Sequence, residues 1–229
     1  MKRIGVVGGL TAESTAVFYR DLTRLYIERC GNADYPEVVI FGVRFGRFMK
    51  WSGAGRWDAF ADGLVEALGG LERAGADFAV IAANMPHMVF DKVQARTRLP
   101  MLHIADAVAR EAASRGFGRI GLLGTEATMG AAFYPDRLRA LGIECIVPEA
   151  ADRATIQAIL DAELFRGVVT EASQQRLAAA IGRLKGRGAQ AAILGCTELP
   201  LALSDENSPL PVLDSTAILV ARTLDEAMA

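Results

Sequence analysis

Histidine, cysteine and tryptophan are scarce in this chain. Its 229 residues include 2 His, 3 Cys and 2 Trp. The cysteines, Cys30, Cys145 and Cys196, are too few and too widely spaced for a disulfide framework or a cysteine-based metal site, and two histidines add little. We therefore expect neither structural disulfides nor a bound metal, and we expect Cys145, within a predicted strand, to be a buried structural thiol.

The chain also lacks an excess of one charge and long apolar runs, and we expect it to have no signal peptide. Its formal net charge is −2, so nothing predicts the basic surface that nucleic acid requires. No apolar run approaches the roughly 18 residues of a membrane span. Lys2 and Arg3 lead directly into a short apolar stretch and a glycine pair, unlike a signal peptide. We expect a cytoplasmic protein that acts on a small molecule and binds neither nucleic acid nor membranes.

No stretch rich in Gly, Pro or Ser divides the chain, but part of its sequence occurs twice. Residues 71–87 align without gaps on residues 184–200, so that Gly75 matches Gly188 and Ala83 matches Cys196. Residues 4–8 similarly resemble 120–124, and residues 99–103 resemble 210–214. Because the three matches occur in the same order, we predict two homologous halves, residues 1–104 with 215–229 and residues 105–214.

The periodicity of apolar residues is typical of an α/β protein. Short apolar segments bordered by Gly or Pro predict buried parallel strands; they are residues 2–8, 38–43, 78–81, 99–104, 119–124, 142–148, 191–194 and 211–213. Residues 57–74 place Phe60, Leu64 and Leu68 on one stripe of a predicted helix. The fold class is therefore α/β, with a parallel sheet in each half.

Reactive side chains follow one of these strands directly. Residues 191–194 are expected to deliver Cys196, Thr197 and Glu198 at the carboxyl end of a strand, where open α/β sheets bind ligands. The first copy of the repeat ends instead in Ala83-Asn84-Met85-Pro86-His87. Asn84 is a candidate ligand residue there, and His87 is either a base or a packed residue at a helix start.

Other candidate ligand residues lie after further strands. Gly8 and Gly9 form either an anion-binding start of a helix or a tight turn, and they lack the G-x-G-x-x-G spacing of a dinucleotide site. Three arginines either clamp a carboxylate or lie on the surface. Two of them, Arg44 and Arg47, lie on a predicted loop that ends near Arg56, and the third is Arg166. Thr125 and Thr128 lie on a second predicted loop, where their hydroxyl groups either bind a carboxylate or cap a helix. Residues 170–173, Thr170 to Ser173, are a second predicted capping site.

The chain as a whole resembles the aspartate/glutamate racemase family. The resemblance rests on residues 4–10, Asn84 to His87, Gly124-Thr125 with Thr128-Met129, Leu194 to Pro200 and Asp214 to Thr216. It implies two α/β halves related by a pseudo-twofold axis, an active site in the cleft between them, no cofactor such as pyridoxal phosphate, and a homodimer. It also implies an isomerase that interconverts the enantiomers of aspartate, glutamate or related acids with one cysteine from each half.

This sequence departs from the family pattern at the first of these cysteines. Ala83 stands where the family has cysteine, Met85 where it has threonine, Arg44 where a polar residue is common and Leu219 where a histidine is frequent. Alanine cannot move a proton, so two-base racemisation is impaired, altered or removed by mutation. Cys196 remains a candidate acid and base. Thr197 and Glu198 are candidates to orient its thiol or to bind the substrate amine.

Three functions follow from this departure. The first is proton transfer at the α-carbon of a small, acidic amino acid by Cys196, with an altered second group opposite. The second is a one-cysteine decarboxylase or isomerase of the arylmalonate decarboxylase type, whose less polar substrate suits Met85. The third is a ligand-binding protein of the same fold without catalytic activity.

Overall fold

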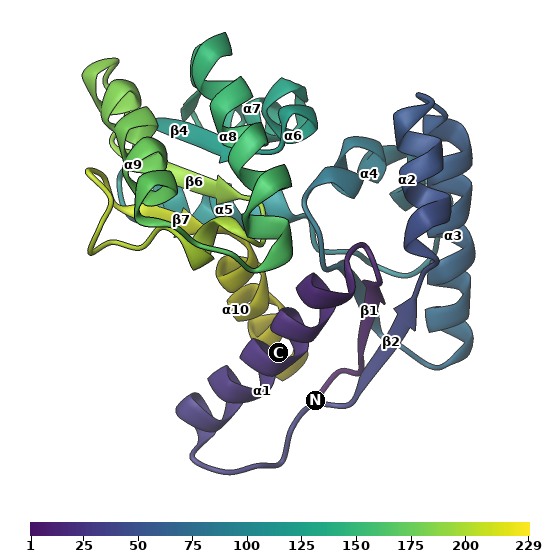
Figure 1. The fold of residues 1–229 in the computed structure, drawn as a ribbon. Coiled ribbons are helices and arrows are strands. Elements are labelled where there is room, and N and C mark those ends of the chain that lie inside the picture. Colours follow the sequence, from purple (N-terminus) through teal and green to yellow (C-terminus); the bar gives the residue numbers. More distant parts are fainter. The chain divides into compact units, whose positions relative to one another are not determined.

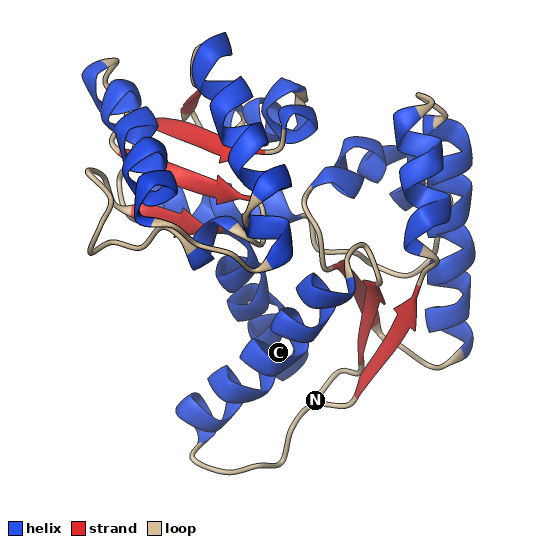
Figure 2. Ribbon diagram, viewed as in Figure 1, coloured by secondary structure: helices blue, strands red, loops and turns tan.

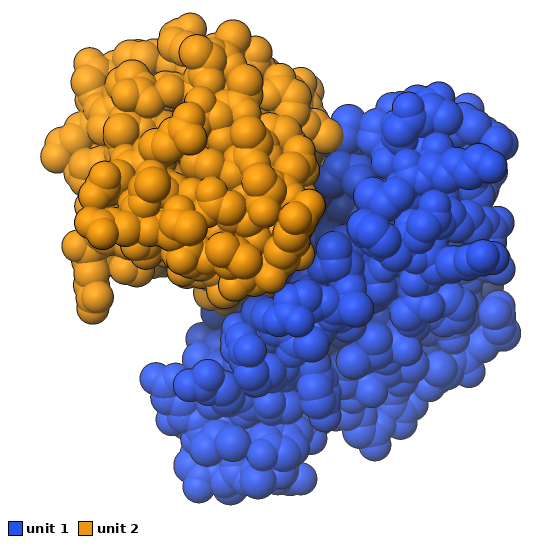
Figure 3. Space-filling model, in the orientation of Figure 1, with its two compact units in different colours: residues 1–104, 219–229 blue, residues 105–218 orange.

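The computed structural model describes residues 1–229. The chain divides into two compact units, residues 1–104 with 219–229 and residues 105–218 (Figure 3). Each unit holds one parallel β-sheet flanked by helices (Figures 1 and 2). The predicted α/β class with parallel sheets is confirmed. None of the helices is both long and apolar enough to cross a membrane.

The sheet of the first unit has three strands. They are β1 Ile4–Gly8, β2 Val38–Gly42 and β3 Phe78–Ile81, in the order β2-β1-β3 and parallel throughout. The strand predicted at residues 99–104 is reduced to one bridge, between Ala79 and Met101. It is short because Pro100 has no N–H to donate to a sheet and because helix α5 already begins at Ile104.

Helices cover this sheet. They are α1 Ala12–Cys30, α2 Phe45–Gly53, α3 Trp57–Arg73 and α4 Phe90–Gln94, together with the 3₁₀ helix Met85–Val89 and most of α10 Ser215–Met228. The predicted stripe of α3 is confirmed, because Phe60, Leu64 and Leu68 are fully buried.

The predicted loop between Arg44 and Arg56 is wrong, because most of it is helix α2. The helix contains Gly46 and Gly53, which are weak helix formers, and it is held in place by the buried ring of Phe48. Phe48 packs edge-on against Phe60 of α3, with ring centroids 4.8 Å apart, and against Trp51 at 5.2 Å. Tertiary packing of one aromatic side chain therefore outweighs the weak helix propensity of glycine.

The sheet of the second unit has four strands. They are β4 Arg119–Gly124, β5 Glu144–Ile146, β6 Ala191–Gly195 and β7 Val212–Asp214, in the order β5-β4-β6-β7 and again parallel. The helices are α5 Ile104–Ser114, α6 Glu126–Gly130, α7 Phe133–Arg139, α8 Ala150–Ala162 and α9 Glu171–Gly186, with 3₁₀ helices at Leu164–Arg166 and Leu199–Leu201. The loop predicted at residues 125–130 is instead the short helix α6.

The sequence repeat is present in the register of both sheets. In the first unit Ala79 pairs with Met101, and their sequence counterparts Ala192 and Val212 pair in the second. The strand order β2-β1-β3 likewise matches β5-β4-β6.

Side chains repeat together with the strands. Arg3 forms an ion pair with Glu37 at the start of β2, and Arg119 forms one with Glu144 on β5, with its Nη2 2.7 Å from Glu144 Oε2. Two equivalent ion pairs at equivalent strand positions indicate two copies of one supersecondary unit.

Candidate active site

The carboxyl end of β6 carries the reactive side chains of the second unit. All five residues of β6 are buried, and the strand lies between β4 and β7. Its last residue, Gly195, pairs with Gly124 of β4. A side chain at Gly195 would lie 2.9 Å from the carbonyl oxygen of Leu123, so the close approach of the two strand ends requires glycine. Cys196 and Thr125, which follow the paired glycines, are thereby brought to neighbouring strand ends.

Cys196, Thr197 and Glu198 form one hydrogen-bonded group. The Cys196 thiol donates to Glu198 Oε2 at 3.0 Å, and the Thr197 hydroxyl donates to the same oxygen at 2.7 Å. Cys196 is 8% exposed and Glu198 is 7% exposed, whereas Thr197 is half-buried. The predicted grouping of these three residues at one strand end is therefore present, and its centre is a buried carboxylate that accepts two hydrogen bonds.

This environment keeps the Cys196 thiol protonated. Burial raises its pKa well above the ordinary value, and the charge of Glu198 and the hydrogen bond to it raise the pKa further. The backbone amides of Glu198 and Thr197 act in the opposite direction but are weaker. At neutral pH the sulfur therefore carries a proton that it can donate, and it becomes a base only after that proton has left.

The neighbouring strand, β4, leads directly into the start of helix α6. Thr125 is the N-cap of α6, and its hydroxyl oxygen accepts a hydrogen bond from Thr128 N at 3.2 Å. The two hydroxyl groups are 3.0 Å apart. Thr128 is 1% exposed, so its hydroxyl serves the cap, whereas the half-buried Thr125 still presents one side to solvent. Of the two uses considered for these threonines, the structure shows the capping one.

The strand end of the first unit carries no comparable reactive group. Ala83 and Asn84 follow β3 and are both buried, and Met85 packs against the apolar core of the unit. His87 Nδ1 lies 3.0 Å from the carbonyl oxygen of Ala83 and 3.2 Å from that of Asn84. Because carbonyl groups only accept hydrogen bonds, Nδ1 carries the proton. His87 is thus the packed residue of the two alternatives, and it fixes the turn after β3.

Histidine His103 was not singled out from the sequence, although it belongs to the same cluster. Its ring centroid lies 4.8 Å from that of His87 and 4.5 Å from that of Phe90. Both histidines of the chain are therefore buried together behind the turn that carries Ala83. The available signal was the repeat, which matches residues 99–103 to 210–214 and so places His103 at the position of Asp214, whose carboxylate caps α10.

Gly9 is a turn residue rather than an anion site. Its φ is +81°, and a side chain there would lie 2.6 Å from the carbonyl oxygen of Val43. Its N–H donates to the Thr15 hydroxyl at 2.8 Å. The amide that was considered for an anion is therefore already bonded, which favours the tight-turn interpretation.

The three candidate arginines differ in their surroundings. Arg44 is exposed at the end of β2 and forms no ion pair or side-chain hydrogen bond, and Arg166 is exposed on the 3₁₀ helix Leu164–Arg166. Arg47 instead stacks over the Trp51 ring at 4.4 Å and lies 3.8 Å from Glu66. Arg44 and Arg166 therefore keep their guanidinium groups available for a carboxylate, whereas Arg47 is committed to its neighbours on α2 and α3.

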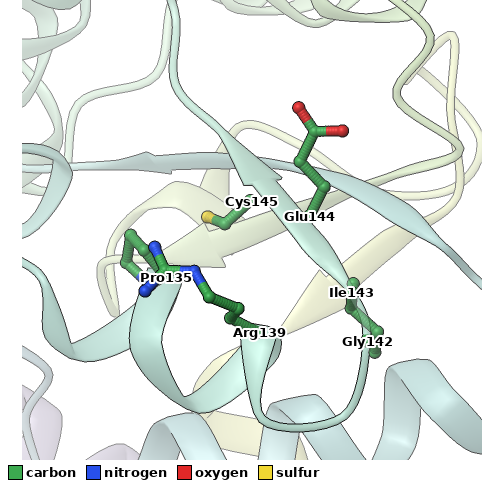
Figure 4. Close-up of a pocket in the computed structure, with 6 residues that line it drawn as sticks. All are labelled: Pro135, Arg139, Gly142, Ile143, Glu144 and Cys145. Atoms are coloured by element: carbon green, nitrogen blue, oxygen red, sulfur yellow. The ribbon is translucent and has the colours of Figure 1, made fainter.

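A separate surface hollow of about 280 Å³ lies beside β5. It is lined by Pro135, Arg139, Gly142, Ile143, Glu144 and Cys145 (Figure 4). Cys145 is half-buried rather than buried as predicted, and burial raises the pKa of its thiol to about 12. This thiol is protonated at neutral pH, which disfavours a role as a nucleophile. No group of His, Cys, Asp or Glu in the chain is arranged to hold a metal ion.

Comparisons with known proteins agree with this architecture. Residues 7–223 match the family described as Asp/Glu/Hydantoin racemase. The broad specificity amino-acid racemase RacX of Bacillus subtilis is 27% identical over 232 residues, which cover 99% of this chain and 98% of the relative.

Solved structures extend the comparison to the fold. An aspartate racemase homologue from Pyrococcus horikoshii is 35% identical and aligns over 100% of both chains with a TM-score of 0.90. The aspartate racemase of Picrophilus torridus is 22% identical, covers 100% of this chain and 95% of its own, has a TM-score of 0.77 and shows a likeness of fold alone. The chain thus belongs to the Asp/Glu/Hydantoin racemase family.

Proposed function

We propose that this protein catalyses cofactor-independent proton transfer at the α-carbon of a small acidic amino acid, with Cys196 as the group that carries the proton. The observation that supports this most directly is the buried Cys196 thiol, 3.0 Å from the Glu198 carboxylate at the end of a central strand. The Bacillus subtilis relative RacX is a broad specificity amino-acid racemase, and racemases are isomerases. The exposed guanidinium groups of Arg44 and Arg166 suit a substrate with a second carboxylate.

The chemistry requires the thiol to change its protonation state. An α-hydrogen beside a carboxylate is a very weak acid, so its removal needs a base in surroundings of low dielectric constant. We propose that Cys196 first passes its proton to Glu198. The resulting thiolate takes the α-proton, and the electron pair of the broken C–H bond stays on the substrate carbon. The thiol exchanges this proton with solvent and then returns a proton to the same face of that carbon. Glu198 finally gives its proton back to the thiolate, which restores the starting state.

Ala83 limits the reaction to this face. Inversion needs a proton donor opposite the base, and the counterpart of Cys196 in the first unit is a methyl group. We therefore propose that exchange of the α-hydrogen with retention of configuration is faster than inversion. The expectation that the substrate lies between the two strand ends stays a prediction.

Solvent exchange tests this proposal. The protein is incubated in D₂O with each enantiomer of aspartate and of glutamate; deuterium at the α-carbon is followed by NMR, and configuration by chiral chromatography. We expect deuterium to enter at least one of them with little inversion, and Cys196→Ser to abolish the exchange. Exchange that persists in Cys196→Ser would remove the thiol from the mechanism. Binding of these acids without exchange would indicate a non-catalytic ligand-binding protein.

A second candidate function is decarboxylation of an arylmalonate-type diacid. The apolar surroundings of Ala83 and Met85, together with a protonated thiol at Cys196, favour it. In this reaction the bond between the α-carbon and one carboxylate breaks, and that carboxylate leaves as carbon dioxide. The thiol protonates the resulting carbanion and then regains a proton from solvent. Release of carbon dioxide from phenylmalonate, with a single enantiomer obtained from a methyl-substituted analogue, would establish this reaction in place of amino-acid exchange.

We also propose that the protein is a homodimer in the cytoplasm. The dimer is expected from the resemblance to the family, and the cytoplasmic location from the composition of the chain. Equilibrium sedimentation measures the first, and fractionation of the cells that produce the protein measures the second.

A further inference from the structure

One oxygen atom of Glu198 accepts hydrogen bonds from both residues that precede it. Its Oε2 is 3.0 Å from the Cys196 sulfur and 2.7 Å from the Thr197 hydroxyl oxygen. The side chain is largely buried, and within the second unit no Lys, Arg or His forms an ion pair with it. These two hydrogen bonds therefore hold the carboxylate beside the sulfur.

The two hydrogen bonds differ in strength. A thiol is a weak donor, whereas a hydroxyl group that donates to an ionised carboxylate forms a short and comparatively strong hydrogen bond. The 2.7 Å between Thr197 Oγ1 and Glu198 Oε2 is the length of a bond of this kind. Thr197 therefore contributes more than Cys196 to the orientation of the carboxylate.

The backbone of this turn does not orient the carboxylate by itself. Leu199 N donates to the carbonyl oxygen of Cys196 at 3.2 Å, and the Leu199 side chain is fully buried. These contacts fix the main chain at Glu198, just before the 3₁₀ helix Leu199–Leu201. A glutamate side chain still has three torsions about which it rotates. The restraint that selects one of its rotamers is the Thr197 hydroxyl.

The hydroxyl proton of Thr197 is committed by this contact. A hydroxyl group has one proton to donate, and here the proton goes to Glu198 Oε2. From the sequence, Thr197 was a candidate to orient the thiol or to bind the substrate amine. In the structure its hydroxyl acts on the thiol indirectly, through the carboxylate that accepts from both.

The sequence repeat indicates that the three residues belong together. In the alignment of residues 71–87 on 184–200, the three positions of this group are occupied in the first unit by Ala83, Asn84 and Met85. The first unit thus lacks the thiol, the hydroxyl and the carboxylate together. The carboxylate and the hydroxyl that restrains it occur in the unit that has a thiol for them to act on.

We propose that Thr197 is a positioning residue, whose hydroxyl holds Glu198 Oε2 against the Cys196 thiol and thereby enables proton transfer between the two. The inference rests on the proposed function, in which the thiol gives its proton to Glu198. In that step the S–H bond breaks, its electron pair stays on sulfur and the proton goes to Oε2. Thr197 keeps its own proton throughout and contributes only the orientation of the acceptor.

Alkylation of Cys196 tests this contact without turnover. Its rate of reaction with iodoacetamide is followed by mass spectrometry over a range of pH in the wild type, Thr197→Val and Thr197→Ser. Without a hydroxyl at position 197 the carboxylate should rotate toward water, because the thiol is too weak a donor to hold it. Since the charge of Glu198 raises the pKa of Cys196, we expect the midpoint to fall in Thr197→Val. Thr197→Ser keeps the hydroxyl and should keep the midpoint of the wild type.

The direction of the shift decides between positioning and an effect of charge. An unchanged midpoint in Thr197→Val would show that Glu198 keeps its place without the hydroxyl. A rise would show that the carboxylate stays beside the sulfur and that the hydroxyl only reduces its negative charge. Either result would overturn the inference. Cys30, at the end of α1 in the first unit, is the internal control, because its alkylation profile should be the same in all variants.

A double-variant cycle tests whether Thr197 acts through Glu198. For α-hydrogen exchange we expect Thr197→Val to lower kcat by about tenfold, to change KM by less than about twofold, and to cause no further loss in Glu198→Gln. A raised KM with unchanged kcat, or additive losses in the double variant, would show that Thr197 binds the substrate instead. Failure of the proposed function would appear as an absence of exchange in the wild type, whereas failure of this inference would appear in the alkylation profiles.

Discussion

The protonation state of Cys196 is set by its immediate neighbours. Reactive cysteines in proteins are commonly thiolates stabilised by positive charge or helix N-termini. Here the thiol is buried and its hydrogen-bond acceptor, Glu198, carries negative charge. A thiol in this environment donates a proton more readily than it attacks an electrophile, which suits proton transfer to carbon rather than covalent catalysis.

Replacement of Glu198 tests this environment through pH. Glu198→Gln removes the negative charge, so the pKa of Cys196 should fall, while burial should still hold it above the ordinary value. The rate of Cys196 alkylation by iodoacetamide, followed by mass spectrometry, rises with the thiolate fraction. We expect its midpoint to lie at lower pH in Glu198→Gln than in the wild type. An unchanged midpoint would show that Glu198 does not control the thiol.

Sequence reasoning grouped neighbouring candidate residues better than it identified the contacts of the others. Cys196, Thr197 and Glu198 could be grouped from the sequence because they are consecutive and follow an apolar strand. The roles of Gly9 and Arg47 could not be assigned in this way, because their partners are Thr15 and Glu66. A polar residue near a strand end is available to a ligand only if no neighbour already occupies its hydrogen-bonding groups, and that depends on the folded structure.

At the scale of elements, turn glycines position the strand ends. Gly9 and Gly116 both adopt positive φ, 81° and 75°, but only Gly9 approaches another backbone segment closely. We expect Gly116→Ala to lower the free energy of unfolding by about 1 kcal/mol, the cost of a left-handed conformation for an L-residue. Gly9→Ala should cost roughly 2–4 kcal/mol, because its Cβ would also contact Val43. Urea unfolding measures both, and equal losses would show that the close approach to Val43 is not a constraint.

A helix cap that was predicted from the sequence is confirmed. The Thr170 hydroxyl oxygen accepts from Ser173 N at 3.2 Å at the start of α9, and the hydroxyl donates to Glu163 Oε2 at 2.9 Å. We expect Thr170→Ala to lower the free energy of unfolding by about 1 kcal/mol, and Thr170→Ser to retain most of it. The comparison is made by urea unfolding. An alanine variant as stable as the serine variant would show that the cap contributes nothing.

Local patterns predicted some elements better than others. The cap at Thr170 and the stripe on α3 depend on residues close in sequence, and both are present. Helix α2 was missed because it depends on Phe48 packing against Phe60 of another helix. The strand at residues 99–104 was overestimated because its pairing is limited by Pro100 and by the start of α5.

At the scale of the whole molecule, the repeat organises the chain. Two copies of one unit place Ala83 and Cys196 at equivalent strand ends, each after the strand that pairs with the first strand of its sheet. This equivalence was readable in the sequence because residues 71–87 and 184–200 align without gaps. The repeat therefore supports the proposal that Ala83 stands where a second proton carrier would lie.

The ratio of inversion to α-hydrogen exchange in Ala83→Cys, compared with the wild type, tests this account most directly. Both rates are measured in D₂O on one enantiomer of the substrate that exchanges, with Ala83→Ser as the control for side-chain size. If the wild type protonates one face, its exchange should exceed inversion, and Ala83→Cys should raise the inversion rate while Ala83→Ser does not. Equal rates of inversion and exchange in the wild type, or no gain of inversion in a folded Ala83→Cys that still binds substrate, would contradict the account.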